Sequence, residues 1–152
     1  MGTQLVAVRA GLIAALADLQ EFALYETTYI PVKGSKARAR CFTDNARLIH
    51  SSASMRAAKT FRNEEGSFDL VLYTEGVGAA ADPVTLSDAL SEVGVAAEDF
   101  IATHANWNSD ALGTSGLNWL AIEGDGGFAE GWTDKGLAVS LTYPITYRAR
   151  LT

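Results

Sequence analysis

The chain has 152 residues, of which 48% are hydrophobic, and a formal net charge of −6. A chain of this length forms one domain and buries roughly 68–70% of its unfolded surface, so it needs neither a disulfide nor a metal for stability. The single cysteine, Cys41, excludes an internal disulfide and fits a reducing compartment.

No targeting signal is expected. The longest uncharged apolar stretch near the start covers residues 10–17, far short of the roughly 20 residues that a membrane span needs. The first residues lack the basic region and apolar block of a signal peptide, and Val6 stands where a myristoylation signal has Ser or Thr. We therefore expect no membrane partner.

The charge is strongly segregated along the chain. Residues 33–62 hold eight of the 12 basic residues and one acid, which gives +7, whereas the remainder holds four bases and 17 acids and carries −13. Such asymmetry predicts that the basic segment meets an acidic surface.

The first part of the chain predicts a helix and two strands. Residues 22–30 are rich in Tyr, Thr and Phe and predict a strand that stops at Pro31. Residues 38–43 alternate weakly and predict a second strand. Apolar residues at helical spacing predict an amphipathic helix over residues 4–19, with Thr3 as its N-cap; they are Leu5, Val8, Leu12, Leu16 and Leu19.

Residues 44–60 are rich in Ser and Ala and show neither the helical nor the strand period. They predict a long loop that could contain a helical turn. Because such loops are uncommon in a compact domain and usually functional or mobile, we expect residues 33–62 to form a basic, mobile segment of a single domain.

The second part predicts a strand, a helix and a closing hairpin. Residues 68–73 have the pattern of a half-buried strand, and residues 76–81 read as a Gly/Ala linker. Asp82 followed by Pro83 predicts the start of a helix that runs to about residue 105, although Gly94 inside it costs about 1 kcal/mol relative to Ala. A polar turn region, residues 106–116, follows.

Alternating runs at residues 117–122 and 137–143 predict two antiparallel strands joined by a long Gly-rich loop. The predicted fold class is therefore α+β. Four or five mostly antiparallel strands form a sheet, and two helices pack on one of its faces.

The Gly-rich loop invites two site interpretations, and both fail on context. Residues 124–129 match a dinucleotide-binding pattern, but further glycines follow where a phosphate-binding helix should begin. Glu123, Asp125, Glu130 and Asp134 surround the loop without the alternating acids of an EF-hand. We predict a flexible, solvated acidic loop with no metal and no cofactor.

No catalytic set is predicted. Leu117 replaces the glycine that a nucleophile elbow would need after Ser115, and His104 completes the apolar stripe of the second helix. Cys41 on an alternating strand is a small buried residue rather than a reactive thiol. We expect no enzyme, and no chemistry at these residues or at His50.

Three tryptophans and one loop phenylalanine are candidates either for the core or for contacts with another chain. Trp119 lies in an apolar strand and is predicted to be core. Phe128 and Trp132 lie on the Gly-rich loop, so they either contact another chain or fold back onto their own sheet. Trp107 has no assigned role.

Four segments resemble the tail terminator family of long, non-contractile-tailed bacteriophages, as found in phages of actinobacteria. Residues 6–12 resemble the opening helix of that family, residues 61–72 its Arg/Glu-marked central strand, and residues 82–103 its long second helix. Residues 131–150 resemble its closing hairpin, which ends in an Arg-Ala-Arg type tail. Residues 33–60 find no clear counterpart.

The resemblance implies a structural role in the virion, with assembly in the host cytoplasm. Members form a ring, generally of six subunits, at the head-proximal end of the tail; it caps the tail tube, stops its polymerisation and offers a surface to the head–tail connector or neck protein. DNA passes through the lumen without specific binding. Two alternatives stay open: a neck or head-completion protein on the portal side, and a small-ligand-binding or enzymatic α+β domain. We place Lys33, Lys36, Arg38, Arg40, Phe128 and Trp132 at the subunit or tube interface.

Overall fold

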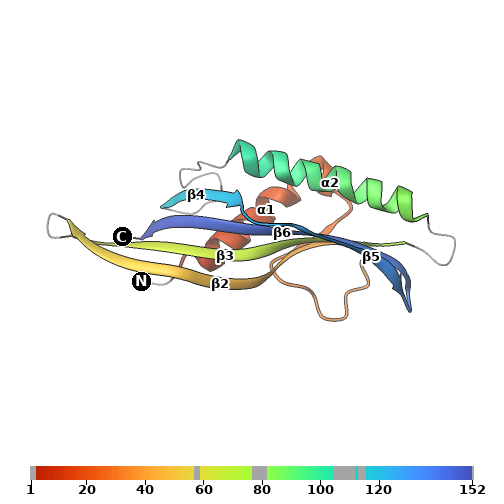
Figure 1. The fold of residues 1–152 in the computed structure, drawn as a ribbon, viewed down its shortest axis with the longest axis horizontal. Helices are drawn as coiled ribbons and strands as arrows, with labels where there is room; N and C mark the ends of the chain where they lie inside the picture. Colours follow the sequence, from red (N-terminus) through yellow and green to blue (C-terminus); the bar gives the residue numbers. More distant parts are fainter. Residues whose placement is uncertain (1–2, 57–58, 77–81, 105–111, 113–115, 152) are drawn as a thin grey trace.

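The computed structural model describes residues 3–56, 59–76, 82–104, 112 and 116–151, without the side chains of residues 50–56, 59–62 and 151. Two helices lie over one face of a long, curved sheet (Figure 1). In chain order the elements are α1 (Leu5–Ala17), the 3-10 turn η1 (Gln20–Phe22), β1 (Glu26–Thr28), β2 (Ala39–Arg56), β3 (Lys59–Glu75), α2 (Pro83–Thr103), β4 (Leu117–Ile122), β5 (Gly127–Thr133) and β6 (Gly136–Leu151).

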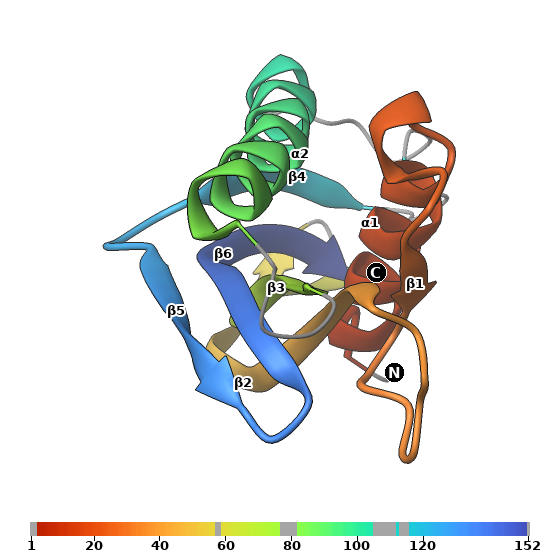
Figure 2. The ribbon, with the colours of Figure 1, turned by 90° about the vertical axis from the view of Figure 1, so that its right-hand side faces the viewer.

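The six strands form one sheet in the order β1-β2-β3-β6-β4, and β5 also pairs with β6. β4 and β5 use different halves of β6, since β4 pairs with residues 145–149 and β5 with residues 136–142. All pairs are antiparallel except β1 with β2, which is parallel. The predicted α+β class is confirmed. The sheet is mixed, with one parallel pair among mostly antiparallel ones, and it has six strands instead of the four or five predicted. β1 and β5 lie at opposite edges (Figure 2).

The two helices begin and pack largely as local signals predict. The Asp82 carboxylate accepts a hydrogen bond from the Val84 N–H at 3.1 Å, and its bond from the Thr85 hydroxyl lowers the pKa of Asp82. Thr3 Oγ1 accepts from the Leu5 N–H at 3.0 Å, although Gln4 occupies the N-cap position of α1. Gly94 lies where α2 crosses β6, and a Cβ there would lie 2.5 Å from the Tyr143 hydroxyl, so a larger residue would require the Tyr143 side chain to shift. No helix in the described residues is long and apolar enough to cross a membrane.

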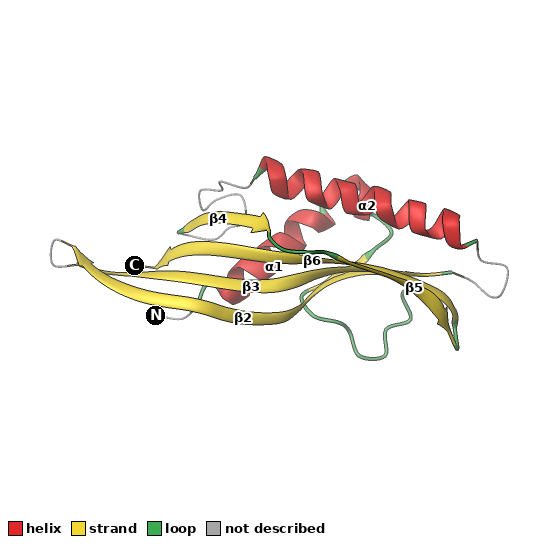
Figure 3. Cartoon of the chain, viewed as in Figure 1, coloured by secondary structure: helices red, strands yellow, loops and turns green. Residues whose placement is uncertain are grey.

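Two loop predictions are wrong, because both segments contain strands. The loop predicted over residues 44–60 is strand on both sides of the undescribed residues 57–58, because β2 runs to residue 56 and β3 begins at residue 59 (Figure 3). The outer part of this ribbon pairs only with itself, and two register shifts in β2 break the period of two. The loop predicted over residues 123–136 contains β5, whose seven residues are all exposed. Neither segment carries the one-sided apolar alternation that marks a half-buried strand.

The strand predicted over residues 22–30 is also shorter than expected. Residue 22 belongs to η1, and the strand itself is only the three residues of β1. Phe22 points into the core and is 1% exposed, so it contributes to packing rather than to the sheet.

Buried charged side chains join α1 to the sheet. Arg9 donates from Nε to Thr43 Oγ1 and from Nη1 to the Tyr29 hydroxyl, each at 2.8 Å. Glu64 Oε2 accepts from the Gln4 N–H at 2.9 Å and from the Tyr147 hydroxyl at 2.7 Å. These polar contacts fix the position of α1 over β2, β3 and β6, because buried polar groups are costly unless they are paired.

Candidate assembly surface

The residues predicted at an interface lie on two parts of the fold at opposite edges of the sheet. Lys33, Lys36 and Arg38 lie between β1 and β2, beside one edge, and Phe128 and Trp132 lie on β5 at the other. Seen end-on, β5 and α2 occupy one side of the molecule, and β1 with the following loop occupies the other (Figure 2). The basic and aromatic candidates therefore form two separate surfaces.

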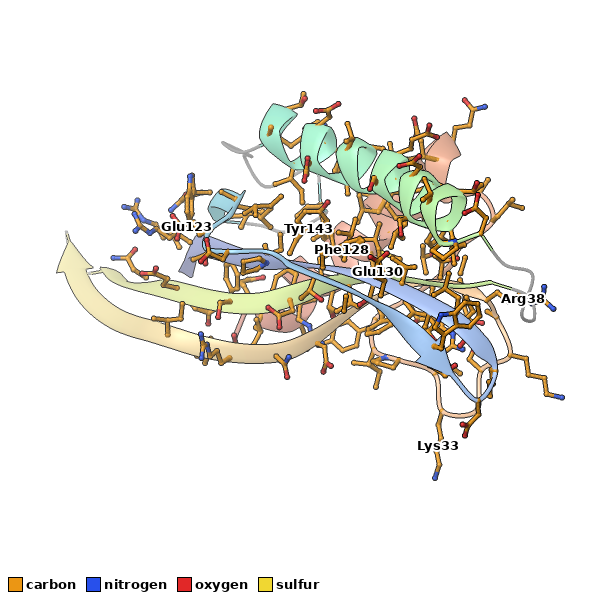
Figure 4. All side chains as sticks on the ribbon, turned by 45° about the vertical axis from the view of Figure 1, so that its right-hand side comes forward. Lys33, Arg38, Glu123, Phe128, Glu130 and Tyr143 are labelled. Atoms are coloured by element: carbon orange, nitrogen blue, oxygen red, sulfur yellow. The ribbon has the colours of Figure 1, made fainter. Side chains whose placement is uncertain are left out.

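The basic surface is the segment of residues 30–38, here called the basic loop. Lys33, Lys36 and Arg38 are all exposed on it, and Lys33 points away from the sheet on the side opposite α2 (Figure 4). A tight turn forms its tip, where the Ser35 N–H donates to the Val32 carbonyl at 3.2 Å and Gly34 has a φ of +74°. Glycine adopts this left-handed conformation without the steric cost that other residues meet.

Arg40 differs from the other predicted cations because it is bound within its own subunit. Its Nε donates to the Ala37 carbonyl at 2.7 Å, and its guanidinium lies 3.6 Å from the Glu75 carboxylate and 5.1 Å from the centre of the Tyr73 ring. Arg40 thus ties the base of the basic loop to the end of β3. Its contribution to an interface would be indirect, through the position of the loop.

A hollow of about 270 Å³ lies where the basic loop meets the ends of β3 and the β5–β6 turn. Four cations line it, together with Glu75; they are Lys36, Arg38, Arg40 and Lys135. No sequence pattern marks Lys135 as part of this charge, although it is the one Lys or Arg between Arg62 and Arg148. The fold therefore strengthens the positive charge at this end of the sheet.

The aromatic surface is half-exposed and lies beside α2. Phe128 and Trp132 are 52% and 59% exposed, so their own subunit does not bury them. Strand alternation places them with Glu130 on one side of β5. That side is the one that α2 covers, because Ser87 on α2 donates to the Glu130 carboxylate at 2.9 Å.

The exposed side of α2 is acidic. Asp88, Glu92 and Asp99 are exposed and follow one another at helical spacing, with Val95 also exposed between them. Every Lys or Arg of the chain lies outside residues 63–134, so the charged groups of α2 and β5 are all carboxylates. We call α2 and β5 with their exposed carboxylates and apolar side chains the α2–β5 face.

Trp119 is not in the core, contrary to the prediction. It is half-buried on the face of the sheet away from the helices, where the Arg148 guanidinium lies 5.2 Å from its ring centre. Leu117 and Leu120 take the core positions of β4 instead, because a register shift follows Leu117. Trp107 and Ser115 lie outside the described residues, as does the side chain of His50.

The described residues contain no group of His, Cys, Asp and Glu side chains that could hold a metal ion. Residues 124–129 lead into β5 rather than into a helix, so they do not form the phosphate-binding turn of a dinucleotide site. His104 caps the end of α2 and packs against Phe100, with 4.6 Å between ring centres.

Cys41 is fully buried, as predicted, and burial raises the pKa of its thiol to about 12. At pH 8 we expect a maleimide to label the native protein at least about a thousandfold more slowly than the unfolded chain, because the thiolate is scarce and shielded. Mass spectrometry of timed samples, with and without denaturant, measures both rates. Rapid labelling of the native protein would contradict the buried position.

No protein-family model matches this sequence, and no curated protein does. Among solved structures, a chain from the virion of a native gene transfer agent particle has a similar fold, with a TM-score of 0.59. The alignment covers 98% of this chain and 100% of that one at 16% sequence identity. The likeness therefore establishes a shared fold over the whole length of both chains, and the resemblance to tail terminators stays a prediction.

Proposed function

We propose that this chain is a structural virion protein that forms a ring on the head-proximal end of a phage tail tube. The observation that carries the proposal is the end-to-end likeness of fold to a virion protein of a gene transfer agent particle. Since the alignment covers nearly all of both chains, the similarity extends beyond one common motif. The resemblance of four sequence segments to tail terminators supports the more specific role.

The surfaces of the subunit fit a ring. A repeated head-to-tail contact needs two different surfaces on each subunit, and it closes into a ring when the rotation between neighbours is right. The basic loop and the α2–β5 face are two such surfaces at opposite edges of the sheet. We propose six subunits per ring, with the tail tube protein and a head–tail connector or neck protein as the other partners.

A reconstruction of the virion tests the proposal. We expect density for this chain as a ring where the tail tube meets the head, and tubes of uncontrolled length when the chain is not made. A ring on the portal side with normal tube length would favour a neck or head-completion protein. A purified monomer that binds a metabolite and is missing from virions would favour a ligand-binding or enzymatic domain.

A further inference from the structure

We infer that the basic loop of one subunit docks on the α2–β5 face of the next copy of this chain. The inference rests on the proposed ring and names the two surfaces that would make its subunit contact. Of the predicted basic segment, residues 33–62, only residues 33–38 belong to this loop, together with residues 30–32 before them. Most of the remainder forms the paired strands β2 and β3.

Charge is the first argument for this contact. The basic loop presents Lys33, Lys36 and Arg38 with no acid among its residues. The α2–β5 face presents only acids, with Asp88, Glu92 and Asp99 along the exposed side of α2. Opposite charges on the two surfaces favour the head-to-tail contact, and like charges oppose loop-to-loop and face-to-face contacts.

Apolar exposure is the second, independent argument. Ile30 and Val32 are 54% and 46% exposed on the basic loop, next to its cations. On the α2–β5 face, Val84 on α2 and the two β5 aromatics are similarly exposed. Each surface thus combines apolar side chains with charge of one sign, and aromatic residues are typical anchors at protein interfaces.

Order in the basic loop is the third argument. Its turn at Gly34, the bond from the Ser35 hydroxyl to the Glu26 carboxylate (2.8 Å) and the Arg40 contacts hold it without help from a partner. A loop already held in place loses less conformational freedom on docking than a disordered arm would. Arg40 is thus a positioning residue, and the three exposed cations are the ones that would meet the neighbour.

A charge-swap experiment tests the contact with the full-length chain. The loop variant K33E/K36E/R38E and the face variant D88K/E92K/D99K each put like charges on both surfaces. We expect each alone to lower the self-association constant roughly a hundredfold or more, because like charges across an interface are strongly unfavourable. Sedimentation of the purified protein and electron microscopy of capped tubes measure the loss.

Restoring opposite charges should restore the ring. A chain with all six substitutions has an acidic loop and a basic face, and we expect it to assemble like the wild type. An equimolar mixture of the two triple variants should also assemble, with the variants alternating around a ring of even number. The control R47E/R148E reverses two exposed cations on the helix-free face of the sheet, and we expect it to assemble normally.

Several outcomes would overturn the inference. The first is that the loop variant alone forms rings. The second is that neither the six-substitution chain nor the mixture assembles. The third is that the wild-type chain self-associates neither in solution nor on tubes. If the loop variant caps tubes normally but alters the retention of DNA, the basic loop serves nucleic acid. Virion imaging reports the proposed function separately, since a ring at the tail end can persist while this particular contact is refuted.

Discussion

Replacing Phe128 and Trp132 together by serine should abolish ring formation while leaving the subunit folded. Both rings are more than half exposed, so the subunit loses little buried area when they are removed. Aromatic anchors at interfaces typically contribute 2 kcal/mol or more each, so we expect association to weaken by roughly a thousandfold. Circular dichroism and thermal melting report the fold, and electron microscopy of tubes reports the ring.

The matched control is the double substitution of Leu48 and Ile49 by serine. These residues are 46% and 52% exposed on β2, remote from β5 in the strand order. We expect this control to form rings, because general loss of surface hydrophobicity does not remove a specific anchor. Equal loss of rings in both variants would show that Phe128 and Trp132 are not specific anchors of the subunit contact.

Replacing Glu64 by leucine should destabilise the subunit more than the other substitutions considered. Glu64 is 2% exposed, and its carboxylate serves the first turn of α1 through Gln4 and the core of β6 through Tyr147. Its removal leaves the buried Tyr147 hydroxyl and the partly buried Gln4 N–H without an acceptor. We expect a cost of roughly 2–5 kcal/mol and a fall in Tm of roughly 5–15 °C. Thermal melting of the purified chain measures the effect.

Neighbouring substitutions give this prediction its controls. Glu65→Leu removes a carboxylate on the opposite face of β3, where Arg148 lies 3.9 Å away and both side chains are partly exposed. We expect that change to stay within about 0.5 kcal/mol. Tyr147→Phe combined with Glu64→Leu should cost less than the sum of the single changes, because the two groups are partners. An unchanged Tm in Glu64→Leu would show that the buried carboxylate is not needed.

Two oppositely charged surfaces on one small subunit have a consequence for assembly in the cell. Exposed charge pairs speed and orient association, and they weaken as ionic strength rises because charges are screened beyond about 8 Å in physiological salt. The apolar side chains in each surface are not screened in this way. An oligomer that uses both surfaces would therefore form quickly and persist in salt.

Sequence patterns alone determined the helices and the core strands. The Asp82-Pro83 start of α2 and the apolar stripe of α1 act through neighbours three or four residues away, so they are visible locally. The strands of residues 68–73 and 137–143 alternate because one side faces the helices and the other faces solvent. In residues 117–122 the register shift after Leu117 interrupts this alternation. Charge clustering and a place in the Gly-rich loop were likewise enough to select the exposed cations and the two β5 aromatics as interface candidates.

The tertiary structure decided the rest, because the determining contacts are remote in sequence. The outer ribbon of β2 and β3, and β5 on the edge of β6, obtain their hydrogen bonds from a partner strand and have no buried face to impose a pattern. The sequence predicts Arg40 as an interface cation, but the sheet brings Glu75 beside it, so Arg40 holds the basic loop in place instead. Gly94 lowers the helix propensity of α2, yet it lets α2 approach β6 closely, because a Cβ there would lie 2.5 Å from the Tyr143 hydroxyl. The separation of the basic and acidic surfaces to opposite edges follows from strand order, which no local signal contains.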